Sequence, residues 1–88
     1  MSESEQEQRD RRILGEAVRQ VRERERLSID EVSAASGVPS RRIAAIEAGR
    51  LDPRFELLLT LAQAMGVRLS AFINRGEELE AEEGGAQD

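Results

Sequence analysis

Residues 27–49 read LSIDEVSAASGVPSRRIAAIEAG and carry the clearest secondary-structure signals of the sequence. Ser28 is followed three residues later by a glutamate, the pattern of a capping box, which predicts that a helix opens there and runs to about residue 36. Gly37 then suits the left-handed conformation that ends many helices. A second helix begins at Pro39 or Ser40, and both choices remain open because proline is tolerated at a first helical position. The stretch therefore predicts two short helices joined by a tight turn.

The second of these helices, over residues 39–48, has two unlike sides. Ile43 and Ile46 make one side apolar, as a core-facing side requires. The rest of the helix is basic at its start and then small, with Arg41 and Arg42 followed by Ala44, Ala45 and Ala48. A helix that is basic at its start and slim along its exposed side can enter the major groove of DNA.

The flanking sequence supplies three more expected helices. Residues 11–26 carry apolar residues on one face, and residues 55–65 are apolar almost all round, which predicts a central, buried helix. Ser70 is expected to cap a short fifth helix that contributes either to the core or to a dimer contact. The apolar face of the first helix comprises Ile13, Leu14, Ala17, Val18 and Val21.

Composition bounds the chemistry. The 88 residues include no cysteine, histidine or lysine. Their absence excludes thiolate and imidazole metal ligands, the commonest general base and Schiff-base chemistry. A serine without a base is not a nucleophile. We therefore expect no enzyme, no metal site and no cofactor. No apolar run approaches the roughly 20 residues of a bilayer span, and the polar start is unlike a signal peptide, so we expect a cytoplasmic protein.

The net charge of −5 is unevenly distributed. Residues 11–76 hold twelve arginines against eight acids, a net +4. Residues 1–10 carry −3 and residues 77–88 carry −6, and both acidic segments are expected to be disordered and outside the folded domain. For residues 1–10 the alternative is the frayed start of the first helix. Because salt screens charges beyond about 8–10 Å, a basic face on residues 11–76 can act locally.

The pattern as a whole resembles the phage-repressor, Cro and XRE-type helix-turn-helix family over roughly residues 13–73. The resemblance implies an all-α, compact, five-helix domain of the lambda-repressor-like kind. It rests on many spaced matches, which are Leu14-Gly15, Leu27-Ser28, Glu31-Val32, Gly37-Val38, Ile43, Ile46-Glu47, Gly49-Arg50, Pro53, Leu57-Leu58, Leu61-Ala62, Met65-Gly66-Val67, Leu69-Ser70 and Phe72.

The resemblance also implies roles for individual residues. The helix over residues 39–48 would be the recognition helix. Base edges would be read by Ser40, Arg41 and Ala45, while phosphates would be bound by Ser28, Arg42, Arg50 and Arg54. The residue chemistry agrees, since arginine can donate two hydrogen bonds to guanine and alanine can touch a thymine methyl.

The resemblance further suggests a salt bridge between Arg22 and Glu47. Glu47 follows Ile43 by four residues and so points toward the protein, where a carboxylate needs a partner. Arg22 lies at the edge of the apolar face of the first helix. The alternative is two separate surface charges.

Two functional hypotheses follow. The first is a sequence-specific regulator of transcription, most simply a repressor, which binds a palindromic operator in double-stranded DNA as a homodimer. The second is a protein-interaction module, such as an antitoxin or transcription cofactor, in which the acidic C-terminal tail could bind a basic partner.

Overall fold

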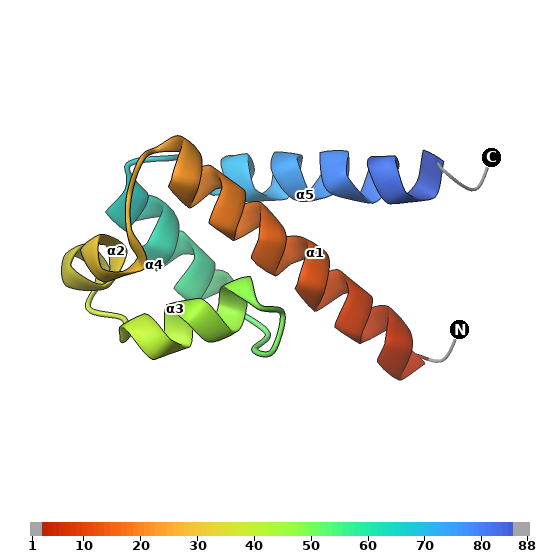
Figure 1. The fold of residues 1–88 in the computed structure, drawn as a ribbon, viewed down its shortest axis with the longest axis horizontal. Coiled ribbons are helices and arrows are strands. Elements are labelled where there is room, and N and C mark those ends of the chain that lie inside the picture. The colour runs from red at the N-terminus through yellow and green to blue at the C-terminus, as the bar shows by residue number, and fades with distance from the viewer. Residues whose placement is uncertain (1–2, 86–88) are drawn as a thin grey trace.

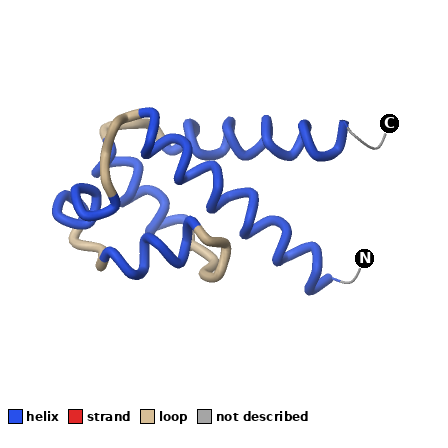
Figure 2. Tube along the Cα trace, in the orientation of Figure 1, coloured by secondary structure: helices blue, strands red, loops and turns tan. Residues whose placement is uncertain are grey.

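The computed structural model describes residues 3–85, which form five α-helices and no strand within that range (Figures 1 and 2). The helices are α1 (Glu3–Arg24), α2 (Ile29–Ser36), α3 (Ser40–Glu47), α4 (Phe55–Met65) and α5 (Leu69–Gly85). The all-α, five-helix fold expected from the sequence is confirmed. Among these residues no single helix is long and apolar enough to span a membrane, although α4 and α5 pass that test as a pair bent by 106°.

α1 is the central helix of the molecule. It packs against α5 on one side and against α3 on the other, while α2 packs against α3 and α4 (Figure 1). The apolar face predicted for the first helix is the face in these contacts, since Ala17, Val18 and Val21 are at most 1% exposed. α5 adds Phe72, which is fully buried. Val18, Val21 and Phe72 form one core with residues from α2, α3 and α4.

The turn between α2 and α3 follows the local signals in the sequence. The Ser28 hydroxyl accepts a hydrogen bond from the backbone of Glu31, and the Glu31 side chain accepts one from the backbone of Ser28, which completes the predicted capping box. Gly37 is left-handed, with φ of 79°, and its N–H donates to the Ser33 carbonyl. Pro39 caps α3 by position, so Ser40 is the first helical residue.

The two ends of the described chain continue the first and last helices. α1 begins at Glu3 and α5 continues to Gly85, so residues 3–10 and 77–85 are helical. Arg9 and Arg12 both donate to the Glu83 carboxylate, at 3.2 and 3.4 Å, so ion pairs join the two extensions. The remaining residues predicted to be disordered, 1–2 and 86–88, lie outside the described part of the chain.

Two finer predictions about helices were wrong. α5 begins at Leu69 and is 17 residues long, so Ser70 lies inside its first turn and is not its cap. α4 has the predicted bounds but is not buried all round, because Phe55 is 64% exposed and Leu59 is 36% exposed. α4 packs against α2 and α5, and no described element covers the side that carries Phe55.

Candidate nucleic-acid interface

α3 is anchored by its apolar side and by two close backbone approaches. Ile43 and Ile46 are fully buried. A side chain at Gly15 would place its Cβ only 2.1 Å from the Ile46 carbonyl oxygen, so the backbones of α1 and α3 touch there. Gly49, with φ of 75°, would meet the Arg12 Cα at 2.9 Å. The end of α3 is therefore fixed on α1 by contacts that only glycine permits.

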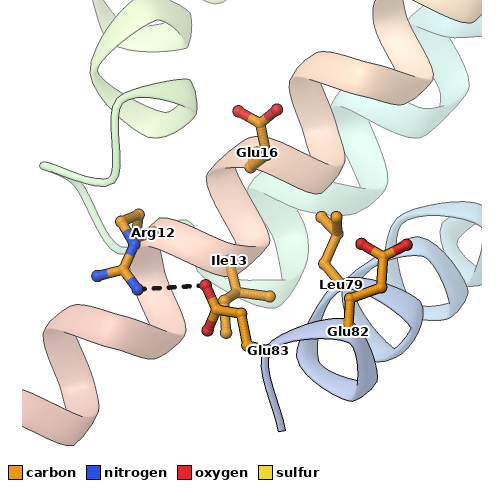
Figure 3. Close-up of a pocket in the computed structure, with 6 residues that line it drawn as sticks. All are labelled: Arg12, Ile13, Glu16, Leu79, Glu82 and Glu83. Atoms are coloured by element: carbon orange, nitrogen blue, oxygen red, sulfur yellow. Dashed lines mark hydrogen bonds and ion pairs between the residues drawn. The ribbon is translucent and has the colours of Figure 1, made fainter. Parts of the chain in front are cut away.

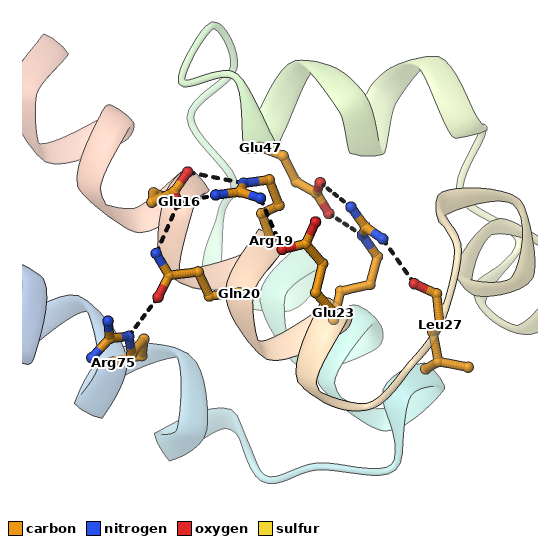
Figure 4. Close-up of polar contacts among 8 residues, drawn as sticks. Glu16, Arg19, Gln20, Glu23, Leu27, Glu47 and Arg75 are labelled. Atoms are coloured by element: carbon orange, nitrogen blue, oxygen red, sulfur yellow. Dashed lines mark hydrogen bonds and ion pairs between the residues drawn. The ribbon is translucent and has the colours of Figure 1, made fainter.

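Arg22 and Glu47 form the ion pair that the sequence suggested. Arg22 donates from Nε and Nη2 to the two Glu47 carboxylate oxygens at 2.7 and 2.9 Å, and its Nη1 donates to the Leu27 carbonyl at 2.8 Å (Figure 4). The side chains are 11% and 5% exposed, and the hydrogen bonds to Glu47 raise the pKa of the Arg22 guanidinium. One guanidinium thus joins α1, the loop before α2 and the end of α3.

The side of α3 opposite its apolar side is positively charged in the first turn and carries only small side chains after it. Arg41 and Arg42 are exposed in its first turn. Ala44 and Ala45 are half-buried and Ala48 is exposed, so nothing longer than a methyl group rises from the middle of the helix. The structure thus brings Arg41 and Ala45, two of the predicted base-reading residues, to one slim helix.

Ser40, the third predicted base-reading residue, is half-buried and held by a neighbour that the sequence did not predict. Its hydroxyl donates to Asp30 Oδ1 at 2.6 Å, across the helix-turn-helix. Asp30 is exposed in the first turn of α2. The only signal in the sequence is that the starts of α2 and α3 carry hydrogen-bonding side chains.

Ser28, a predicted phosphate ligand, is exposed but has its backbone N–H engaged by Glu31. Its oxygen accepts from the Glu31 backbone, which leaves the hydroxyl proton as its one donor for an outside group. The first turn of α2 also carries the carboxylates of Asp30 and Glu31, which oppose an anion at this helix start.

The other predicted phosphate ligands flank the end of α3. Arg50 is exposed in the loop after α3, and Arg42 and Arg54 line one cleft of about 420 Å³. Asp52 and Glu56 line the same cleft, so its two cations are balanced by two acids. The sequence predicted the cations and missed the acids.

The acidic C-terminal end of α5 is separated from α3 by α1. α1 and α5 enclose a second cleft, of about 450 Å³, whose lining is Arg12, Ile13, Glu16, Leu79, Glu82 and Glu83 (Figure 3). Figure 1 shows α5 and α3 on opposite sides of α1. The charge separation inferred from the sequence therefore has a structural form, with α1 between the arginines of α3 and the glutamates of α5.

A polar chain along α1 ties it to α5. Arg19 donates to Glu16 and Glu23, Gln20 donates to Glu16 at 2.8 Å, and Arg75 of α5 donates to the Gln20 amide oxygen at 2.7 Å (Figure 4). The hydrogen bonds from Arg19 lower the pKa of the Glu16 carboxyl. No sequence motif indicated these hydrogen bonds. They connect α5 to α1, the helix that also contacts α3.

Comparison with known proteins gives a consistent result. The family model described as helix-turn-helix matches residues 18–72, and none of the curated proteins matches the chain. The fold is similar to the crystal structure of the clp gene regulator ClgR from C. glutamicum, with 26% identity and a TM-score of 0.75 over 78% of this chain and 90% of that one. Since the matched residues include the capping box, the turn at Gly37 and all of α3, the chain belongs to the helix-turn-helix family.

Proposed function

We propose that this protein is a sequence-specific regulator of transcription that binds double-stranded DNA and acts most simply as a repressor by occluding a promoter. The observation that carries the proposal is the pair of exposed arginines, Arg41 and Arg42, at the start of a slim helix whose opposite side is buried. Membership of the helix-turn-helix family and similarity to a gene regulator support it.

The proposed mechanism assigns α3 to the major groove. Arg41 donates two hydrogen bonds to guanine O6 and N7, the commonest specific contact, and Ala45 touches a thymine methyl while letting the helix sit deep. Ser40 reads a neighbouring base. Arg42, Arg50, Arg54 and the Ser28 hydroxyl bind phosphates, which adds affinity without sequence preference.

The proposed assembly is a homodimer on a palindromic operator. Two helix-turn-helix units place their recognition helices one DNA turn apart, about 34–36 Å, so two-fold symmetry in the protein matches two-fold symmetry in the site. Such a regulator would reside in the cytoplasm, on the nucleoid.

The rival function is a protein-interaction module such as an antitoxin or cofactor. It is favoured by the exposed carboxylates of Glu77 and Glu80 on α5, for which the described residues provide no ion-pair partner. These acids would suit a basic protein partner.

A gel-shift assay against genomic fragments at about 0.15 M salt separates the two functions. The regulator is expected to retard a small subset of fragments at protein concentrations that leave the others free. Retardation of none, together with stoichiometric capture of a basic protein, would replace the proposed function with its rival.

A further inference from the structure

The contact between Asp30 and Ser40 determines how Ser40 can read a base. Ser40 is the first residue of α3 and Asp30 the second of α2, and the distance from Ser40 Oγ to Asp30 Oδ1 is 2.6 Å. An ionised carboxylate has acceptors only, so the hydroxyl must be the donor. A distance of 2.6 Å is in the range of charge-assisted O–H···O⁻ bonds, which are about twice as strong as neutral ones.

The bond leaves Ser40 with one kind of hydrogen bond to offer. A serine hydroxyl has a single proton and two lone pairs. Because the hydroxyl proton of Ser40 points toward Asp30, the Ser40 oxygen can only accept a hydrogen bond from a group outside the protein. The carbonyl oxygens of guanine and thymine are neutral acceptors, so they compete poorly with a carboxylate for that proton.

We infer that Asp30 is a specificity-determining residue that turns Ser40 into an obligate acceptor, so that Ser40 selects cytosine or adenine. In the major groove cytosine presents its N4 amino group and adenine its N6 amino group as donors. Guanine and thymine present only acceptors and the thymine methyl there, and an acceptor facing an acceptor is repulsive. A serine without such a neighbour accepts or donates and pairs with either kind of base. The inference rests on the proposed function, because it assigns a base class to one position of the proposed interface.

Asp30 has a second effect that the test must separate from the first. It is an exposed negative charge in the first turn of α2, next to the start of the recognition helix. Such a charge repels phosphates whatever the sequence, so its removal raises affinity for all duplexes together. Base preference and general affinity are therefore distinct readouts, and only the first depends on Ser40.

The test is a double-mutant cycle read by selection of bound duplexes from a random pool. The proteins are wild type, Asp30→Ala, Ser40→Ala and the double variant, each checked for folding by circular dichroism. Ser40→Ala identifies the base position that Ser40 reads. At that base pair wild type is expected to favour, by about 3- to 10-fold, the range of one hydrogen bond, the orientation that turns a cytosine or adenine amino group toward Ser40. Asp30→Ala is expected to lose this preference, and in the Ser40→Ala background to change nothing further there.

The outcomes separate the two levels of the proposal. No enriched sequence with any protein would overturn the proposed function itself. An enriched sequence in which Ser40→Ala alters no position would overturn the inference alone. So would an Asp30→Ala protein that keeps the cytosine or adenine preference, or one whose effect on that position persists without Ser40.

Discussion

At the residue scale, a few side chains hold α3 in position, and Glu47 is the one with the most tightly defined contacts. It is 5% exposed and receives two hydrogen bonds from Arg22, which is itself bonded to the Leu27 carbonyl. A buried ion pair is weak evidence of net stability, yet removal of one partner leaves an uncompensated buried charge. The pair is therefore a device for fixing geometry, in which each member depends on the other.

Replacement of Glu47 by alanine should destabilise the fold strongly. We expect the free energy of unfolding in urea to fall by about 3–5 kcal/mol, since Arg22, whose side chain is only 11% exposed, would lose its charged partner. The matched control is Glu23→Ala, which removes an exposed partner of Arg19 and should cost at most about 1 kcal/mol. A loss below about 1 kcal/mol for Glu47→Ala would mean that the pair behaves as a surface pair.

Arg42 provides a residue-scale test of phosphate binding. Because a phosphate contact carries no base information, Arg42→Ala should weaken all duplexes by similar factors and lower the slope of log affinity against log salt by about 1. Titrations by fluorescence anisotropy over a series of salt concentrations measure both quantities. An unchanged slope, or a loss confined to one preferred sequence, would exclude a phosphate role for Arg42.

At the scale of elements, the sequence predicted most of the helix-turn-helix because its signals are local. A capping box, a glycine at a helix stop and an apolar spacing on α3 depend on neighbours within one or two turns. The contact between the two ends of the chain is not local. Arg9 and Glu83 are 74 positions apart, and the sequence does not show that they pair.

Helix contacts also explain why two helical glycines have opposite roles. The Cβ of a residue at Gly15 would lie 2.1 Å from the Ile46 carbonyl oxygen, whereas at Gly76 it would lie 3.9 Å from the Ala17 Cβ, an ordinary contact. Gly15→Ala should therefore destabilise the fold by at least about 2 kcal/mol through overpacking of the backbone.

Gly76→Ala serves as the matched variant in α5. It should stabilise the fold by about 0.5–1 kcal/mol, because alanine is the better helix former and the space accepts a methyl group. Urea unfolding of both variants measures the contrast. Equal effects of the two substitutions would contradict the close approach of α1 and α3.

The polar chain between α1 and α5 makes stability depend on pH. Hydrogen bonds from Arg19 lower the pKa of Glu16 below its ordinary value of 4.5 in the folded state. A depressed carboxyl pKa contributes stability that is present above the unfolded value and is lost as the pH falls through the folded value. Wild type should therefore exceed Glu16→Gln in unfolding free energy at about pH 7, and the difference should shrink once the pH falls below 4.5. A difference that stays constant down to the folded pKa would exclude this linkage.

At the scale of the whole molecule, the arrangement of charge matters more than its sum. The chain is acidic overall, yet α3 and the loop after it carry four exposed arginines, Arg41, Arg42, Arg50 and Arg54, while the glutamates of residues 77–83 lie on α5. α1 lies between these two helices and packs against both (Figure 1). Net charge alone argues against an anionic partner, whereas the charges of the separate segments, which the sequence already shows, remove that objection.

The sequence did not predict which residues of the neighbouring helices and loops lie next to the proposed DNA-binding residues. Asp30 meets Ser40, and Asp52 and Glu56 share a cleft with Arg42 and Arg54. These acids lie on α2, on the loop before α4 and on α4 itself, and their proximity to the arginines depends on how the helices pack. Periodicity assigns a residue to a face of its own helix, but it does not identify the neighbour of that face.

Selection of bound sequences from a random duplex pool, with wild type and Arg41→Ala in parallel at about 0.15 M salt, most directly tests whether α3 reads DNA. Wild type should enrich a two-fold symmetric sequence with half-sites about one helical turn apart and a guanine in each. Arg41→Ala should relax that guanine and lose about 1–3 kcal/mol of affinity for the enriched sequence. An unenriched pool, or the same guanine selected equally strongly by both proteins, would contradict direct readout by α3.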